Sequence, residues 1–300
     1  MKNQIKKVIV ILGPTASGKS DLGIKLARRF NGEIISADSR QVYRKMDIGT
    51  GEVTKKEQKI IRHHLLDIAD PKKIFTVSDF KNLGERAIKD ILNKDKVPFV
   101  IGGTGFYIDA LVKNISLPEV TANKKLRAKF DKMTTENLYK ELKKLDRSRA
   151  QAIDPKNKRR LIRALEIIKT TGKPVPKLVS STKYQILWLG LKPKNLEKRI
   201  KLRLEERLKQ GMVKEVRNLL AQGVSKKRLY DFGLEYRWLG EYLADKINYK
   251  EMKEGLCRAI IKYSKRQMTW FKRNKEIHWI KTRIEAEDLI SSFVRSRQEA

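Results

Sequence analysis

The feature that most constrains the fold is a glycine-rich loop between a short apolar run and a helical pattern. Residues Gly13–Ser20 read GPTASGKS and match the phosphate-binding pattern G-x-x-x-x-G-K-[ST]. The run Val8–Leu12 before the loop indicates a buried strand, and Asp21–Phe30 after it has the apolar spacing of a helix. Because the glycines let backbone amides converge on an anion and the helix start adds positive potential, this arrangement predicts a phosphate site.

Two side chains of the loop carry specific chemistry. Lys19 supplies a mobile cation, and the Ser20 hydroxyl is a candidate ligand for a Mg²⁺ ion that bridges the phosphates. The alternative is a tight structural turn without a ligand. We interpret the loop as a diphosphate site formed by Gly13, Pro14, Thr15, Ala16, Ser17, Gly18, Lys19 and Ser20.

Short apolar runs alternate with helical patterns over the first hundred residues, which is typical of a parallel sheet covered by helices. From Leu117 to Lys183 the pattern changes to charged helices, and the strand-like run Tyr184–Gly190 follows. We therefore predict an α/β, P-loop NTPase-like core of residues 1–116 and 184–300, with a small all-helical insertion domain of residues 117–183. The remaining predicted strands are Glu33–Ser36, Val97–Ile101 and His278–Ile280, and the remaining predicted helices are Phe75–Lys94, Asn123–Lys132, Thr135–Leu145, Lys156–Lys169, Leu196–Gln210, Met212–Gln222 and Tyr249–Arg273.

The charge balance indicates a polyanionic partner. The 300 residues include 69 Lys and Arg against 35 Asp and Glu, a formal net charge of +34, which is typical of nucleic-acid binding, although a generally Lys-rich proteome would have the same effect. Cys257 is the only cysteine, which excludes intrachain disulfides and multi-cysteine zinc sites and fits a reducing cytoplasm. No apolar stretch approaches the length of a membrane span, so we expect no membrane contact. We also expect a cytoplasmic protein that acts as a monomer.

Two further loops follow predicted strands, where ligands of open parallel sheets bind. Asp38 in the first should face the phosphate loop and could accept a proton or position a metal; alternatively it caps the next segment. Thr104, in the segment Gly102–Tyr107, presents a hydroxyl among three glycines, or lies in a simple turn. No acidic residue ends the strand Val97–Ile101, which argues against an ordinary ATPase or GTPase and leaves small kinases and other enzymes with phosphate-bearing donors.

Two basic segments are candidates for RNA contact. Five cations lie within Lys156–Arg163, and Tyr263–Arg273 interleaves aromatic and cationic residues. The first could equally be a solvated helix face, and the second an amphipathic helix that packs Trp270 and Phe271 inward. His63 and His64 lack the spacing of a metal site, so we assign them to local structure.

Taken together, seven segments resemble the bacterial tRNA isopentenyltransferase family, the tRNA dimethylallyltransferases, in their order and spacing from Val8 to Ile280. They are GPTASGKS, SADSRQVYRKMDIGTG, HHLLDI, FVIGGTGFYIDAL, DPKNKRRLIRALEI, TGKP and KRQMTWFKR. The resemblance implies transfer of a dimethylallyl group from dimethylallyl diphosphate to the exocyclic amine of adenosine 37, in the anticodon stem-loop of tRNA. Whether the loop also binds ATP is left open.

The resemblance also implies roles for individual residues. Asp38 would be the general base, Lys19 would assist the leaving diphosphate with Mg²⁺, and Thr104 would contact the flipped base or the leaving group. The residues implied to contact tRNA are Asp38, Ser39, Arg40, Gln41, Thr104, Arg127, Arg159, Arg160, Arg163, Lys265, Arg266 and Gln267. Ile261 replaces an arginine that the family commonly has, so a cation is missing there; Arg203 and Arg217 are candidate substitutes. The segment Phe232–Arg237 also departs from the family's Gly-Tyr-Lys-Glu-like pattern.

Two other functions remain open on this reasoning. A nucleoside or nucleotide kinase would also use Lys19 and Asp38, but the basic insertion and the lack of a lid-like arginine pattern argue against it. A P-loop protein that binds RNA without catalysis, with nucleotide as a switch, is the alternative from a different class.

Overall fold

The computed structural model describes residues 6–181 and 183–296. The chain divides into two compact units, a core formed by the residues up to 114 and from 181 onward, and an insertion of residues 115–180. These bounds lie two or three residues before the predicted ones, 117 and 183.

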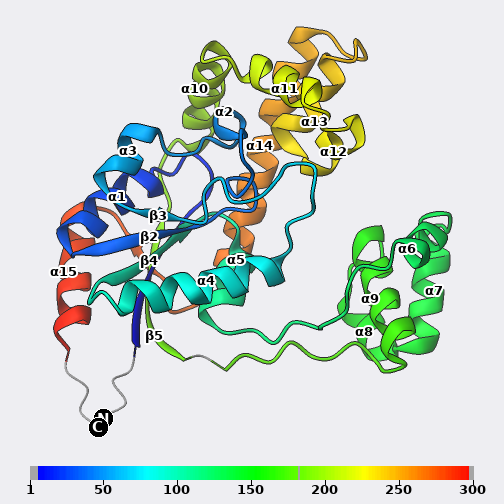
Figure 1. Cartoon of the computed structure of the whole chain (residues 1–300), viewed down its shortest axis with the longest axis horizontal. Coiled ribbons are helices and arrows are strands. Elements are labelled where there is room, and N and C mark those ends of the chain that lie inside the picture. Colours follow the sequence, from blue (N-terminus) through cyan, green and yellow to red (C-terminus); the bar gives the residue numbers. More distant parts are fainter. Residues whose placement is uncertain (1–5, 182, 297–300) are drawn as a thin grey trace. The chain divides into compact units, whose positions relative to one another are not determined.

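The core contains a parallel sheet of six strands in the order β3-β2-β4-β1-β5-β6 (Figure 1). The strands are β1 Lys6–Leu12, β2 Gly32–Ala37, β3 His63–His64, β4 Val97–Gly102, β5 Tyr184–Leu191 and β6 His278–Ile280. Central β1 is buried from Val8 to Leu12, as a continuous apolar run in a parallel sheet requires. The predicted α/β class is therefore confirmed.

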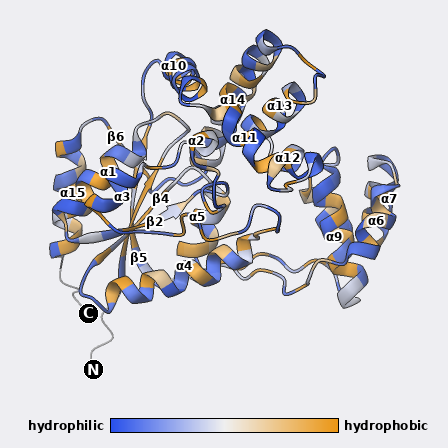
Figure 2. Cartoon of the chain, turned by 45° about the horizontal axis from the view of Figure 1, so that its top comes forward, coloured by the Kyte–Doolittle hydropathy of each residue, from blue (hydrophilic) through white to orange (hydrophobic). Residues whose placement is uncertain are grey.

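Helices cover both faces of the sheet. Val8 and Val10 of β1 pack with Phe80 of α4 on one face, whereas Ile9 packs with Leu26 of α1 on the other. This division follows from the alternation of side chains along a strand, and Figure 2 shows the apolar strands between helices of mixed hydropathy. The core helices are α1 Lys19–Arg29, α2 Asp47–Thr50, α3 Lys55–Ile60, α4 Val77–Leu92, α5 Gly105–Val112, α10 Leu196–Lys209, α11 Met212–Ala221, α12 Lys226–Phe232, α13 Leu234–Tyr242, α14 Tyr249–Phe271 and α15 Arg283–Arg295.

A third cluster of apolar side chains joins α10 to α14 and fixes their positions beside the phosphate loop. Met212, Val216, Tyr236 and Leu256 are buried in it together with Met46, which precedes α2. The short strand β3 was not predicted, because two histidines have no apolar alternation. His64 Nε2 lies 2.7 Å from Glu33 Oε2 of β2, so the histidine pair serves local structure, as expected.

The insertion is all-helical, with α6 Lys124–Asp131, α7 Thr135–Leu145, α8 Arg147–Ala152 and α9 Lys158–Thr171. Its core includes Leu138, Leu142 and Leu161. Glu166 is fully buried in this unit and accepts two hydrogen bonds from Arg127, at 2.7 and 2.8 Å, and one from Arg163 at 2.6 Å. Burial opposes its ionisation, but these bonds prevail and lower the pKa of Glu166 to about 2.

Candidate active site

The phosphate loop connects β1 to α1 in a geometry that only glycine permits at two positions. Gly18 has a φ of 90° and precedes α1, whose start has no side-chain cap. A Cβ atom on Gly13 would lie 2.8 Å from Ser17 Oγ and 3.0 Å from the Leu191 carbonyl oxygen. The buried Ser17 Oγ has no hydrogen-bond partner among the described residues. The loop therefore offers uncapped amides and a spare hydroxyl, as an anion site requires.

Lys19 is held in this loop with a weakened proton affinity. Its Nζ lies 3.3 Å from the Pro14 carbonyl oxygen. Burial and the nearby positive charge of Arg203 lower the pKa of Lys19 to about 8, whereas the negative charge of Asp38 opposes the shift. An anion bound beside Lys19 would restore the charged form, because it supplies the negative partner that the desolvated ammonium lacks.

A cavity of about 680 Å³, here called the donor cavity, opens in front of the loop. Arg199 Nε donates to the Ala16 carbonyl oxygen at 2.8 Å, and Arg203 Nη2 donates to the Gly51 carbonyl oxygen at 2.9 Å. Arg203 thus supplies a cation beside Lys19, whereas the other candidate substitute, Arg217, is exposed on α11. The lining residues are Ala16, Ser17, Gly18, Lys19, Ser20, Asp21, Asp47, Ile48, Gly51, Glu52, Val53, Thr54, Lys55, Glu57, Arg199, Leu202, Arg203, Glu206, Arg207 and Gln210.

Asp38 follows β2 and caps the turn that comes next, which is one of the two roles considered for it. Its Oδ1 accepts a hydrogen bond from the Arg40 amide at 2.8 Å, so it caps the next turn. Its charge also acts on Lys19 and Arg203, raising the pKa of each against the effect of burial. The carboxylate is therefore close enough to the phosphate loop to share its electrostatic field.

The loops after β2 and β4 are joined at Thr104. Its amide donates to the Ala37 carbonyl oxygen at 3.1 Å, and its hydroxyl oxygen accepts from the Ser39 amide at 3.1 Å. The Tyr263 hydroxyl also hydrogen-bonds with Thr104, and burial and the charge of Asp38 raise the pKa of this phenol to about 12. Thr104, Ser39 and Asp38 consequently form one polar group at the ends of neighbouring strands.

Known proteins of one family are similar to this chain over most of its length. A family model described as IPP transferase matches residues 41–274. The chain is 38% identical over 286 residues to a tRNA dimethylallyltransferase of Caldanaerobacter subterraneus subsp. tengcongensis, with 91% of each chain covered. It is 42% identical over 282 residues to tRNA dimethylallyltransferase 2 of Shewanella sediminis, with 91% of this chain and 92% of that relative covered.

The chain belongs to the IPP transferase family. The resemblance found in the sequence motifs is thereby confirmed. A solved tRNA isopentenylpyrophosphate transferase of Bacillus halodurans superposes with a TM-score of 0.72 at 34% identity and 96% coverage of both chains. A eukaryotic dimethylallyltransferase acting on tRNA superposes with a TM-score of 0.75 at 29% identity, covering 88% of this chain and 69% of that one.

Gln267 lies inside this family member rather than on the surface expected for RNA contact. It is 7% exposed; its Oε1 accepts from the Thr15 amide at 2.9 Å and its Nε2 donates to the Gly103 carbonyl oxygen at 2.8 Å. The side chain thus ties the phosphate loop to the Thr104 loop. The spacing of Ser264, Gln267 and Phe271, all buried on α14, is the sequence signal that indicates this position.

Four other residues expected to contact tRNA have partners within their own unit. Arg40 Nε donates to the Phe232 carbonyl oxygen at 2.8 Å. Gln41 accepts from Ser36 Oγ at 2.8 Å and donates to the Gly51 carbonyl oxygen at 3.3 Å. Arg127 and Arg163 hold the buried Glu166, so their side chains organise the insertion. The basic segment at the start of α9 therefore contributes at least Arg163 to the internal structure of the insertion.

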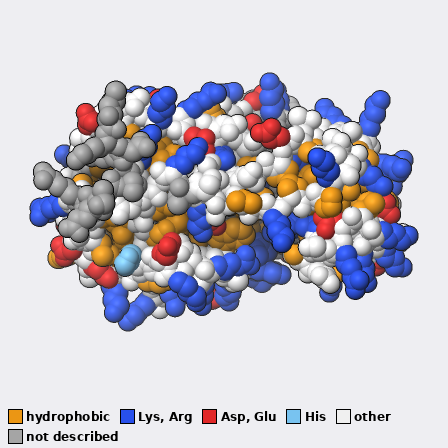
Figure 3. All heavy atoms as spheres, turned by 90° about the horizontal axis from the view of Figure 1, so that it is seen from below, with side chains coloured by type: hydrophobic (Ala, Val, Ile, Leu, Met, Phe, Trp, Pro, Cys, Tyr) orange, Lys and Arg blue, Asp and Glu red, His pale blue; other side chains and the backbone are white. Residues whose placement is uncertain are grey.

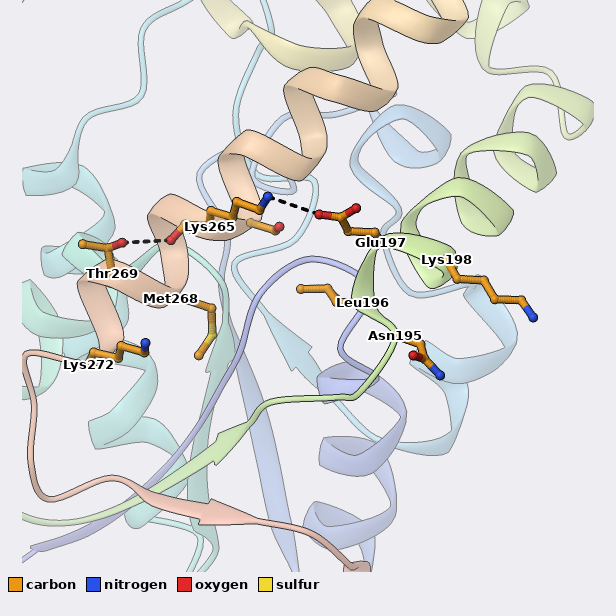
Figure 4. Close-up of a pocket in the computed structure, with 9 residues that line it drawn as sticks. Asn195, Leu196, Glu197, Lys198, Lys265, Met268, Thr269 and Lys272 are labelled. Atoms are coloured by element: carbon orange, nitrogen blue, oxygen red, sulfur yellow. Dashed lines mark hydrogen bonds and ion pairs between the residues drawn. The ribbon is translucent and has the colours of Figure 1, made fainter.

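Lys265 and Arg266 are exposed on α14, as an RNA-facing pair would be. Lys265 Nζ lies 3.2 Å from Glu197 Oε1 of α10, at the edge of a second cavity of about 700 Å³ that Lys198 and Lys272 also line (Figure 4). On the same helix Trp270 donates to Asp109 Oδ2 at 2.8 Å and Phe271 is buried, so the amphipathic interpretation also holds. Lys and Arg side chains are spread over the face seen in Figure 3.

Three carboxylates that sequence reasoning missed gather beside the donor cavity. Ligand oxygens of Asp47, Glu52 and Asp67 lie within 4.8 Å of one another. Burial and the charges of Asp67 and Asp47 raise the pKa of Glu52 to about 8, and Lys55 Nζ lies 2.8 Å from Asp67. Asp47 and Glu52 line the same cavity as Ser20. These oxygen donors are the kind that Mg²⁺ prefers.

Proposed function

We propose that the chain transfers the dimethylallyl group of dimethylallyl diphosphate to the exocyclic amine of adenosine 37 in tRNA, forming N6-isopentenyladenosine and diphosphate. The observation that supports this best is the contact between the phosphate loop and the loops that follow β4 and β2. A Cβ on Gly103 would lie 3.5 Å from Lys19 Nζ, and the neighbouring Thr104 accepts from the amide of Ser39, which follows Asp38. The curated relatives carry the same activity in their names.

The donor diphosphate binds in front of the phosphate loop, against Lys19, Arg203 and the amides at the start of α1. The Ser20 hydroxyl, Asp47 and Glu52 would hold a Mg²⁺ ion, which would supply positive charge opposite the leaving diphosphate. Positive groups fixed in a partly buried cavity stabilise the developing charge without reorganising. Lys19 and Arg203 are both desolvated by burial and so meet this requirement.

The acceptor adenosine leaves its stack in the anticodon loop and enters beside Asp38 and Thr104. A single-stranded loop makes this extrusion inexpensive. The amine nitrogen bonds to the allylic C1 carbon while the bond from C1 to the diphosphate oxygen breaks, and the bonding electron pair leaves with the diphosphate. Asp38 takes the proton lost by the amine. Lys265, Arg266 and the cations of the insertion, Arg159 and Arg160 among them, hold the tRNA.

We also propose that the enzyme acts as a monomer in the cytoplasm, where tRNA is found. Among the described residues no helix combines the length and the apolar character needed to cross a bilayer. A kinase function has less support, because the family model and the relatives are transferases of an isopentenyl or dimethylallyl group.

Incubation of the protein and unmodified tRNA with either labelled dimethylallyl diphosphate or γ-labelled ATP separates these functions. We expect label in tRNA only from the first donor, and mass spectrometry of digested nucleosides should identify N6-isopentenyladenosine. A transcript with guanosine at position 37 is the matched control and should remain unlabelled. Transfer of phosphate from ATP to a nucleoside or nucleotide, with no prenylation, would overturn the proposal.

A further inference from the structure

The wall of the donor cavity that faces the phosphate loop is a short segment, Met46–Gly51, with little structure of its own. Its only helix, α2, has four residues and no side-chain cap at its start. An isolated turn of this length is not stable in water, because helix nucleation is unfavourable. The position of this wall must therefore be set by other elements.

Glu215 of α11 holds the segment through its backbone amides. Its Oε2 accepts from the Ile48 amide at 2.6 Å and its Oε1 accepts from the Gly49 amide at 2.9 Å. Tyr236 completes the arrangement by donating its hydroxyl proton to Glu215 Oε1 at 2.9 Å. Tyr236 is 1% exposed, and a Cβ on Gly49 would lie 2.5 Å from its hydroxyl oxygen. The carboxylate and the segment thus have a single close-packed arrangement.

Arg207 of α10 holds the same segment through its carbonyls. Its Nε donates to the Ile48 carbonyl oxygen at 2.6 Å, and its Nη2 donates to the Gly49 carbonyl oxygen. Glu235 Oε1 lies 3.1 Å from Arg207 Nη2 and offsets its charge. The amides of Ile48 and Gly49 are therefore held by a carboxylate, and the carbonyls of the same two residues are held by a guanidinium.

The segment in turn fixes a cation of the donor cavity. The Gly51 carbonyl oxygen accepts from Arg203 Nη2 at 2.9 Å and from Gln41 Nε2 at 3.3 Å. Gly51 also packs directly against the Arg203 guanidinium, which a Cβ at Gly51 would meet. Any shift of the segment must move Arg203, whereas Glu215 itself is absent from the described residues that line the cavity.

We propose that Glu215 is a positioning residue for donor binding: it fixes the backbone of Met46–Gly51 and, through the Gly51 carbonyl, the Arg203 guanidinium that faces the diphosphate. The inference rests on the proposed function only in taking this cavity as the diphosphate site. Glu215 makes no contact with substrate and acts through Arg203.

The test uses the full chain and measures diphosphate binding by calorimetry, together with separate KM values for dimethylallyl diphosphate and tRNA. Glu215→Gln replaces one of the two carboxylate oxygens that accept from the Ile48 and Gly49 amides with an NH₂ group, which cannot accept. We expect it to weaken diphosphate binding and raise the donor KM about tenfold, the loss typical of one hydrogen bond to a charged group. The KM for tRNA should change less than twofold. Glu205→Gln removes an exposed carboxylate that pairs with Lys253 and is the matched control, with no expected change.

A double-mutant cycle separates positioning from general destabilisation. If Glu215 acts through Arg203, then adding Glu215→Gln to Arg203→Ala should change diphosphate affinity by less than twofold. Additive losses, or an unchanged affinity in a folded Glu215→Gln protein, would overturn the inference. If the Glu215→Gln protein does not fold, Tyr236→Phe provides the test, because it removes only the hydroxyl that donates to Glu215. We expect its affinity for diphosphate to fall two- to threefold. An unchanged affinity would overturn the inference. Failure of the unaltered chain to bind diphosphate would refute the donor site itself.

Discussion

Replacement of Gln267 by leucine should destabilise the core by several kcal/mol and weaken donor binding. The amide makes two hydrogen bonds, at 2.9 Å to the Thr15 amide and 2.8 Å to the Gly103 carbonyl. Leucine has a similar volume but leaves the buried Gly103 carbonyl and the half-buried Thr15 amide without this partner. Each such group costs about 1–3 kcal/mol, so we expect a loss of about 2–6 kcal/mol in the free energy of unfolding.

Urea unfolding followed by tryptophan fluorescence measures this loss, because all four tryptophans, including Trp188 and Trp270, lie in the core unit. Gln222→Ala is the control; its Oε1 accepts from Lys45 at an exposed position, and surface changes of this kind cost about 0.5 kcal/mol or less. Gln267→Glu keeps an oxygen that can accept from the Thr15 amide but loses the group that donates to the Gly103 carbonyl. Its loss in the free energy of unfolding should therefore lie between those of Gln267→Leu and Gln222→Ala. A loss below about 0.5 kcal/mol for Gln267→Leu would refute the argument that this side chain joins the two loops.

Three further predictions concern the charges. The pKa of Lys19 is about 8 in the unliganded protein, so diphosphate affinity should fall as pH rises above 8, by at most about tenfold for each pH unit. Calorimetry at several pH values checks this dependence, which should vanish in Lys19→Ala. Arg203→Ala should weaken diphosphate binding at least about tenfold, whereas Arg217→Ala should change it less than twofold, and equal losses would contradict the choice of Arg203. Glu166, with a pKa lowered to about 2, stabilises the insertion above its unfolded pKa and loses this effect as pH falls toward 2. The difference in melting temperature between the unaltered chain and Glu166→Gln should therefore become smaller as pH falls from the unfolded pKa toward 2. A difference that stays constant would contradict the proposed role of the Glu166 charge.

The sequence predicted the elements whose signals are local. Val8–Leu12 is apolar throughout because both faces of a central parallel strand are buried, and the loop that follows needs glycine at Gly13 and Gly18 for steric reasons that the motif records. The joint spacing of seven motifs identified the family. The strand at His63 was missed because its pairing with β2 depends on Glu33 and on the neighbouring backbone rather than on an apolar pattern.

The remaining site features depend on partners distant in the sequence. Arg127 and Arg163 lie in basic stretches that favour a solvated or RNA-facing interpretation, and only the fold brings the buried Glu166 to them. Gln267 follows two exposed cations, yet the helix turns it inward between two loops that lie 164 and 252 residues away. The choice of Arg203 over Arg217 likewise required the position of α10 beside Lys19.

The rate of a single turnover with Asp38→Asn tests the central claim most directly. Asparagine keeps the oxygen that accepts from the Arg40 amide, so the loop should retain its structure while the base is removed. With both substrates saturating, we predict a rate lower by about 10²–10⁴-fold, the usual contribution of a general base, and affinities for diphosphate and tRNA within about threefold of the unaltered chain. An unchanged rate of prenyl transfer would contradict the account.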